Sequence, residues 1–296
     1  MREYHFSTLD VFANQAFGGN PLAVFSDAAG MSDDEMQSIA AEMSYSETTF
    51  VTPPTDPANT ATVRIFTPKN EVPFAGHPNV GTGVVLARLL NRTSLRLEEK
   101  AGIVLVDVRD VDSDAPAATI QAPRGFTRDR DFAANEIADC LSISADAIDA
   151  THHAPTLASV GLPFVIAELK SLDALRRCAP NYAAFEECDR LYKYPDDRFS
   201  VYAYVRTGEA TLESRMFAPL SGTLEDAATG SAAGAVAALI ASLGAKSVTS
   251  LSITQGVSMG RPSTLEAEAT KRGDIVECVT ITGRCVFMIE GTLRLR

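Results

Sequence analysis

The sequence predicts a mixed α/β (α+β) fold of two pseudo-symmetric domains, each a curled, mostly antiparallel sheet wrapped around a central helix. Three observations carry this prediction: the chain length, a duplicated set of motifs, and two helical segments that lack a polar face. The chain has 296 residues, 46% of them hydrophobic, which is long for a single hydrophobic core. Two domains are therefore expected.

The duplication consists of matching segments that occur in the same order in both halves. RIFTP at 64–68 matches RMFAP at 215–219, and GNPLAVF at 19–25 matches GLPFVIA at 161–167. Behind each R-x-F-x-P segment lie a loop and a glycine-led helical segment of small residues. Convergent α/β patterning is the alternative explanation. Several matches in one order favour a true structural duplication.

The expected central helices are AGHPNVGTGVVLARLL at 75–90 and TGSAAGAVAALIASLG at 229–244, with Gly76 aligned on Gly230. Neither segment has a polar face, so each must be enclosed by other elements. Small residues allow strands to approach such a helix closely. A sheet curled around each helix meets both requirements.

The remaining elements follow from local patterns. The opening MREYHFSTLDVF alternates and is typical of a strand rather than a signal peptide. Ser32-x-x-Glu35 is a capping box that begins a helix, because apolar residues follow at helical spacing. TTFVTP and FSVYAYV predict strands. We place the domain boundary within 120–131, which gives domains 1–125 and 126–296; the last strands could return to the first domain.

Composition and charge exclude several classes of function. The formal net charge is −12 and no Lys/Arg cluster occurs, which disfavours a nucleic-acid partner and argues weakly against an anionic membrane. The longest apolar run, 232–243, is shorter than the ~20 residues that span a bilayer. The five cysteines are odd in number and form no C-x-x-C pair, so we expect a cytoplasmic protein without a zinc site.

The two glycine loops predict an anion site. The first N–H groups of a helix lack intrahelical acceptors, and its N-terminal end carries positive potential. Glycine and alanine leave these groups accessible to a carboxylate or phosphate. We expect both helix starts to face one cleft between the domains; ordinary helix starts packed on strands are the alternative. No Gly-Lys-Ser/Thr ending and no G-x-G-x-x-G after a strand is present, which disfavours a P-loop and nicotinamide binding.

Polar residues stand at or near these loops. His77 is either a structural histidine or a donor to a bound anion or an enolate-like oxygen. Asp226 is either a loop or capping acid or a functional carboxylate, and Ser231 is either an N-terminal hydroxyl or a substrate contact. Glu47, between a helix and a strand, occupies a common place for a surface acid. A general base there needs partial burial to move its pKa toward neutrality.

Several motifs together resemble the phenazine-biosynthesis PhzF-like family: FGGNPLAVF, SETTFV, RIFTPKNEVPFAGHPNVGTG, EDAATGSAAG and QGVSMGRPS. They run in family order from Phe17 to Ser263, so the resemblance covers nearly the whole chain. It implies the diaminopimelate-epimerase-like fold, a homodimer, and a cofactor-independent isomerase whose active site lies between the domains.

The resemblance also implies roles for individual residues. Glu47 matches the family's acid–base glutamate, and His77 and Asp226 match its further catalytic residues. The residues expected to bind substrate are Asn20, Gly76, Gly230, Ser231 and Ala232. One departure is Ala227, where the family usually has proline. Without the fixed φ of proline, the loop is expected to be looser and Asp226 less firmly oriented.

The sequence thus predicts an isomerase of a small cyclic or aromatic-like carboxylic acid, acting by a proton shift through Glu47 with no metal or organic cofactor. N–H groups around Gly76–Gly81 and Gly230–Ala233 are expected to hold the substrate carboxylate. A non-catalytic ligand-binding or interaction protein that keeps the cleft is the alternative. Amino-acid epimerisation or racemisation is disfavoured, because relatives with that activity use two cysteines in these loops and none falls there in this chain.

Overall fold

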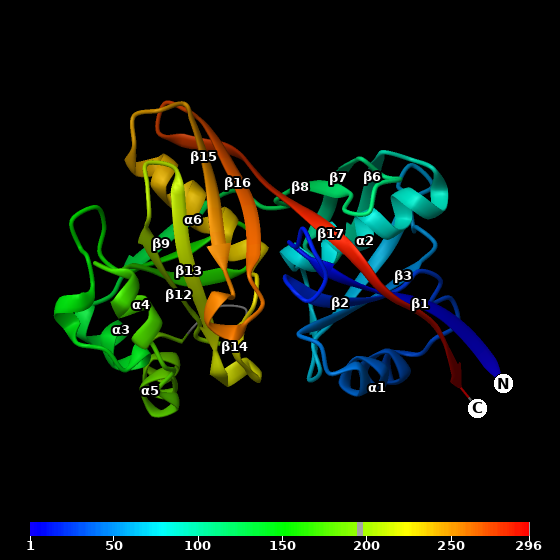
Figure 1. Ribbon diagram of the computed structural model, residues 1–296, viewed down its shortest axis with the longest axis horizontal. Coiled ribbons are helices and arrows are strands. Elements are labelled where there is room, and N and C mark those ends of the chain that lie inside the picture. The colour runs from blue at the N-terminus through cyan, green and yellow to red at the C-terminus, as the bar shows by residue number, and fades with distance from the viewer. Residues whose placement is uncertain (194–197, 296) are drawn as a thin grey trace. The chain divides into compact units, whose positions relative to one another are not determined.

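The computed structural model describes residues 1–193 and 198–295 and divides the chain into two compact units. Unit 1 comprises Met1–Arg124 and Ile281–Arg296, and unit 2 comprises Gly125–Thr280. Each unit contains a curled sheet of mostly antiparallel strands and a central helix (Figure 1). The predicted fold class is confirmed.

Unit 1 contains two helices and most of its strands in the first part of the chain. These are β1 (Arg2–Val11), β2 (Asn20–Phe25), α1 (Asp33–Met43), β3 (Glu47–Thr52), β4 (Ala61–Phe66), β5 (Glu71–Val72), α2 (Gly76–Leu90), β6 (Ser94–Glu99), β7 (Gly102–Arg109) and β8 (Ala117–Gln121). The last strand, β17 (Ile275–Leu295), begins in unit 2 and ends in unit 1, where it pairs antiparallel with β1.

A parallel strand pair positions one end of unit 1. Strand β2 runs parallel to β3 with Leu22 opposite Glu47, and α1 connects them. The predicted capping box starts α1: the Ser32 side chain accepts from the Glu35 N–H, and the Glu35 carboxylate accepts from the Ser32 N–H. Because the two strands are parallel and in this register, the residues that begin them lie at the same end of the sheet.

Helix α2 is enclosed by the strands of unit 1. It contacts β1, β2, β3, β6, β7 and β8, and it is buried from Gly76 to Ala87. A Cβ at Gly81 would lie 2.5 Å from Leu22 Cδ2, and a Cβ at Gly83 would lie 2.5 Å from Val106 Cγ1. The small residues therefore let the strands close around this helix, as predicted.

Unit 2 contains the remaining helices and strands. They are β9 (Thr127–Asp131), α3 (Ala134–Leu141), β10 (Thr156–Ser159), β11 (Pro163–Glu168), α4 (Leu172–Arg177), α5 (Tyr182–Tyr192), β12 (Val201–Arg206), β13 (Thr211–Ala218), β14 (Thr223–Asp226), α6 (Gly230–Leu243), β15 (Val248–Gln255) and β16 (Ser263–Arg272). Three short 3₁₀ turns, η1 (Ala145–Ala147), η2 (Pro219–Ser221) and η3 (Val257–Met259), complete it.

The strand pairing of unit 2 repeats that of unit 1. Strands β11 and β12 are parallel, β12 and β13 antiparallel, β13 and β15 parallel, and β15 and β16 antiparallel. The same sequence of directions links β2, β3, β4, β6 and β7. Helix α6 lies against β10, β11, β15 and β16 in the position that α2 has in unit 1. The duplicated motifs therefore correspond to a duplicated topology.

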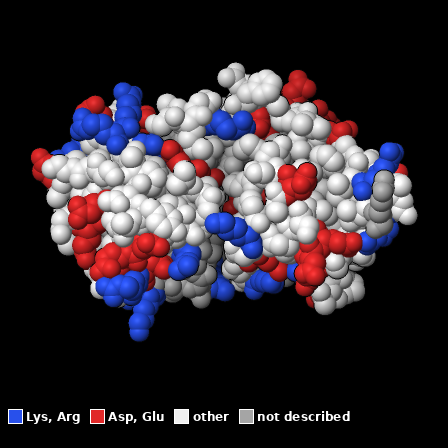
Figure 2. Space-filling model, turned by 90° about the horizontal axis from the view of Figure 1, so that it is seen from below, with Lys and Arg blue, Asp and Glu red and all other residues white. Residues whose placement is uncertain are grey.

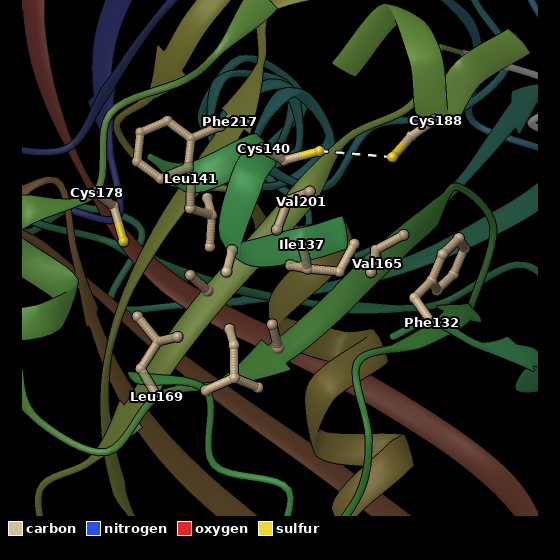
Figure 3. Close-up of a cluster of buried hydrophobic side chains, with 14 of the residues drawn as sticks. Phe132, Ile137, Cys140, Leu141, Val165, Leu169, Cys178, Cys188, Val201 and Phe217 are labelled. Carbon is tan, nitrogen blue, oxygen red and sulfur yellow. Dashed lines mark hydrogen bonds between the residues drawn. The ribbon is translucent and has the colours of Figure 1, made fainter. Parts of the chain in front are cut away.

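A hydrophobic cluster in unit 2 joins its outer helices to the sheet (Figure 3). Ile137 of α3 lies among Val165 and Val201 of the parallel strands, and all three are fully buried. The Sγ atoms of Cys140 and Cys188 lie 3.7 Å apart, and every cysteine of the chain is a free thiol. These sulfurs act as packing groups between helices.

Charged residues of both signs are mixed on the surface. On the face shown in Figure 2, Lys and Arg form small groups that alternate with Asp and Glu. Several of these charges are paired, for example Arg190 with Glu187 at 2.7 Å and Lys246 with Glu209 at 2.9 Å. Within the described residues, every helix is too short or too polar to cross a membrane.

Candidate active site

Unit 1 brings Glu47 and His77 together. Glu47 is the first residue of β3, and His77 is the second residue of α2. Glu47 Oε2 lies 3.6 Å from His77 Nε2, and the two side chains are 19% and 3% exposed. The Glu47 side chain is therefore the more exposed of the two, although its Oε2 is buried.

His77 is an uncharged imidazole. Burial lowers its pKa to about 3, because the protonated ring would lose its hydration. At neutral pH the contact with Glu47 is consequently not an ion pair. At 3.6 Å it is also longer than a hydrogen bond. Among the described residues, His77 Nε2 has no hydrogen-bond partner, so it can donate to a third group.

A short chain of side chains fixes the tautomer of His77. The Ser46 hydroxyl donates to Asn20 Oδ1 at 3.0 Å, which directs the amide nitrogen of Asn20 toward His77 Nδ1, 3.4 Å away. With an N–H donor at Nδ1, that nitrogen accepts and the ring proton resides on Nε2. The Nε2–H then points at the Glu47 carboxylate. Ser46 and Asn20 meet because β2 and β3 are parallel and start at the same end.

The start of α2 provides few backbone donors. Its N-cap, Ala75, makes no side-chain capping bond, so the N–H groups of Gly76 and His77 have no intrahelical acceptor. Pro78 has no N–H to offer. The glycine at 81 serves close packing against Leu22. The role of Gly76–Gly81 in binding the carboxylate stays a prediction, and within that range the N–H groups of Gly76 and His77 lack intrahelical acceptors.

Unit 2 holds Asp226 through its neighbours. The Thr229 hydroxyl donates to Asp226 Oδ2 at 2.7 Å. Gln255 Nε2 donates to the Asp226 carbonyl at 2.8 Å and to Thr229 Oγ1 at 3.0 Å, and Gln255 Oε1 accepts from the Thr229 N–H at 3.2 Å. All three residues are buried. Sequence reasoning missed Thr229 and Gln255; the signal for each was its place in a quoted motif, Thr229 within EDAATGSAAG and Gln255 at the start of QGVSMGRPS.

The start of α6 carries the other predicted binding residues. Gly230, Ser231 and Ala232 form its first turn and are buried, and Thr229 at the N-cap makes no side-chain capping bond. The Ala233 N–H donates to the Thr229 carbonyl at 2.9 Å, which begins the intrahelical ladder. The N–H groups before it, from Gly230 to Ala232, lack intrahelical acceptors and lie at the positive end of the helix.

A buried acid that the sequence did not indicate lies beside α2. Burial raises the pKa of Glu99 well above its usual range, and the nearby Asn79 side chain offsets only part of this effect. Both carboxyl oxygens of Glu99 are buried. These conditions favour the protonated, neutral acid.

Glu47 and His77 in unit 1, and Asp226 in unit 2, are not grouped with further described residues in the way that a metal centre requires. Within residues 1–193 and 198–295, no group of three or more His, Cys, Asp or Glu could hold a metal ion. Cys140, Cys178 and Cys188 belong to the helix–sheet cluster of unit 2, and Cys285 lies on β17 opposite Val11.

Comparison with known proteins assigns the chain to a family. The PhzC-PhzF model, described as phenazine biosynthesis-like protein, matches residues 9–291. The chain belongs to this family. The sequence resemblance is thereby confirmed over nearly its whole length.

Members of the PhzC-PhzF family resemble this chain in sequence and in fold. A trans-2,3-dihydro-3-hydroxyanthranilate isomerase of Pseudomonas chlororaphis is 36% identical over 297 residues, covering 99% of this chain and 100% of the relative. A PhzF-family protein of Bacillus anthracis has a TM-score of 0.84 at 25% identity, with 100% of both chains covered. A predicted epimerase of Pseudomonas aeruginosa has a TM-score of 0.82 at 28% identity, covering 99% of this chain and 100% of that one. The relatives support an isomerase of the PhzF type.

Proposed function

We propose that this PhzC-PhzF family member is a cofactor-independent isomerase that shifts a proton within a small cyclic or aromatic-like carboxylic acid. The observation that carries the proposal is the pairing of a partly exposed Glu47 side chain with a neutral His77, with 3.6 Å between Oε2 and Nε2. A carboxylate beside a neutral N–H donor combines a base with a stabiliser of developing negative charge.

In the proposed reaction Glu47 removes a proton from a carbon activated by conjugation. The electron pair of the broken C–H bond moves into the conjugated system and shifts the double bond. The Nε2–H of His77 donates to the oxygen on which negative charge develops. Glu47, now a carboxylic acid whose proton exchanges with solvent, delivers a proton to a different carbon on the same face, so the number of protons in the substrate is unchanged and heavy water supplies deuterium.

The proposal also includes Asp226 and the first turn of α6, both in unit 2. Thr229 donates to Asp226 Oδ2 and so orients the carboxylate, which in this proposal positions the substrate or relays a proton. The N–H groups of Gly230, Ser231 and Ala232 would bind the substrate carboxylate at the positive end of α6. Asp226 and these residues would act on the same molecule as Glu47 and His77, and substitutions in either set should affect the same reaction.

Hydrogen exchange with solvent tests the proposal. The parent protein is incubated in heavy water with trans-2,3-dihydro-3-hydroxyanthranilate, the compound named for the Pseudomonas relative, and with simple cyclic carboxylates. We expect deuterium incorporation together with a moved double bond. Glu47→Gln should lower the rate about 10²- to 10⁴-fold, because an amide cannot carry the transferred proton.

The matched control is Glu42→Gln, which neutralises an exposed acid on the preceding helix and should leave the rate unchanged. Melting temperature and stabilisation by the carboxylate should persist in Glu47→Gln. Equal rates in this variant and the parent would remove Glu47 from the mechanism. A parent that is stabilised by carboxylates without exchanging hydrogen would be a binding protein, which is the alternative function.

A further inference from the structure

The arginine of each R-x-F-x-P repeat forms an ion pair with a glutamate on the short strand that follows. Arg215 of β13 donates from Nε and Nη2 to the two carboxyl oxygens of Glu225, at 2.8 and 2.7 Å. Arg64 of β4 donates in the same way to Glu71, at 2.9 and 2.7 Å. Each pair is a bidentate fork, so it fixes the direction as well as the distance of the carboxylate.

The remaining nitrogen of each guanidinium, Nη1, donates hydrogen bonds to a third segment of the chain. Arg215 Nη1 donates to the Leu175 and Cys178 carbonyls at 3.0 and 2.7 Å, next to α4. Arg64 Nη1 donates to Asp33, in the first turn of α1. The side chains of Arg215 and Glu225 are only 10% and 16% exposed. These pairs are therefore anchored and partly desolvated, unlike mobile surface ion pairs.

Each of the two paired glutamates lies a few residues before the start of a central helix, α2 or α6. Glu225 is followed at once by Asp226, and α6 begins at Gly230. Glu71 lies on β5, and α2 begins at Gly76 with His77 next. The sheet pairing agrees: β14 and β5 each add a few residues antiparallel to the arginine-bearing strand. Fixing the glutamate therefore fixes the backbone that leads into the site residues.

We infer that Arg64 and Arg215 are positioning residues, each of which acts through its glutamate to hold the loop before a helix start. The effect of these arginines on catalysis rests on the proposed function. Their effect on loop conformation does not, because each arginine, its glutamate and the loop belong to one unit. It also gives the R-x-F-x-P repeat a physical role. The phenylalanine of the motif belongs to the arrangement, since the guanidinium of Arg215 lies 4.8 Å from the Phe217 ring centroid and that of Arg64 lies 5.1 Å from Phe66.

Amide hydrogen exchange, measured by mass spectrometry on the full chain, tests directly whether the arginines restrain the two loops. Lysine keeps the charge but lacks the planar fork. Arg215→Lys should accelerate exchange in 223–234 about 10- to 100-fold while the rest of unit 2 keeps its rates. Arg64→Lys should do the same in 71–79. Glu225→Gln provides a second variant if Arg215→Lys does not fold.

The matched control is Arg206→Lys. Arg206 also binds a buried glutamate, with Nε 2.9 Å from Glu168 Oε1, but Glu168 ends β11 and leads toward α4, not toward α2 or α6. This variant should leave exchange in 223–234 unchanged. Uniform acceleration across unit 2, or no change in either loop, would overturn the inference.

Activity provides the second measurement. Arg215→Lys should lower the rate of deuterium incorporation about 10- to 100-fold through kcat, and methylguanidinium should restore part of the rate to Arg215→Ala. Full activity in Arg215→Lys, or activity losses in Arg206→Lys of equal size, would contradict a positioning role. If the parent itself incorporates no deuterium, the proposed function fails, while the amide exchange result still decides whether the arginines hold the loops.

Discussion

Replacing His77 tests whether a neutral imidazole stands at the centre of the site. Its pKa in the folded protein is lowered to about 3, whereas an unfolded chain gives about 6.5. Between these values the unfolded state binds a proton that the folded state does not. Stability is therefore full above about pH 6.5 and declines as the pH falls toward 3. Near pH 5, about 1.5 pH units below the unfolded value, the loss is about 2 kcal/mol.

His77→Gln removes this titration and keeps a side chain that can donate a hydrogen bond. The free energy of unfolding is measured in urea near pH 8 and near pH 5 for parent and variant. The decline between the two conditions should be smaller in the variant by about 2 kcal/mol. In the folded parent, the His77 ring resonances, assigned by their absence from the variant, should not titrate down to about pH 5.

Two results would refute this reasoning. A His77 ring that titrates near pH 6.5 would mean that the folded protein tolerates the cation. An unchanged pH dependence in His77→Gln would mean that other groups cause the acid sensitivity. In either case His77 would be able to form a true ion pair with Glu47, and the neutral-donor role in the proposed mechanism would be wrong.

Three further substitutions give separate tests. Glu99→Gln should reduce the loss of stability at high pH, because a carboxyl whose folded pKa is raised contributes fully only at low pH and loses its contribution as the pH rises through that value; an unchanged urea profile across pH would contradict this. Gly83→Ala places a Cβ 2.5 Å from Val106 and should cost about 1–3 kcal/mol by thermal denaturation, while Gly125→Ala, with open space around it, should not; equal melting temperatures would disprove the close packing. Gln255→Leu should slow deuterium incorporation about 10-fold with unchanged carboxylate binding, since the Asp226 loop loses two donors; an unaltered rate would separate Gln255 from the site.

Local patterns were sufficient to predict the elements that depend on nearby residues. The capping box Ser32–Glu35 determined the start of α1, because both of its hydrogen bonds lie within four residues. The starts of α2 and α6 followed from the alignment of Gly76 on Gly230. The enclosure of these helices followed from their lack of a polar face, and Gly83 shows the close approach that small residues permit.

Asn20 was predicted as a substrate-binding residue, but its contacts with Ser46 and His77, like the role of Gln255, depend on register and on long-range pairing. Ser46 and Asn20 are 26 residues apart, and they meet only because β2 and β3 are parallel with Leu22 opposite Glu47. A shift of that register would separate them, and no periodicity in the sequence specifies it. Gln255 likewise contacts Asp226 across 29 positions. The neutrality of His77 is also beyond sequence reasoning, since it results from burial by elements on all sides.

The Asp226 loop is held without the proline that the family usually has at position 227. Ala227 is 3% exposed, and its carbonyl accepts from Ser263 Oγ at 3.0 Å. Gly256 has a φ of +75°, and a Cβ there would lie 2.6 Å from that same carbonyl oxygen, so backbone packs directly on backbone. Gln255 holds the neighbouring Asp226 carbonyl. Because these tertiary contacts fix both peptide oxygens, the missing proline changes mainly the conformational freedom of the unfolded chain, and the direction of the Asp226 carboxylate is maintained by the folded structure.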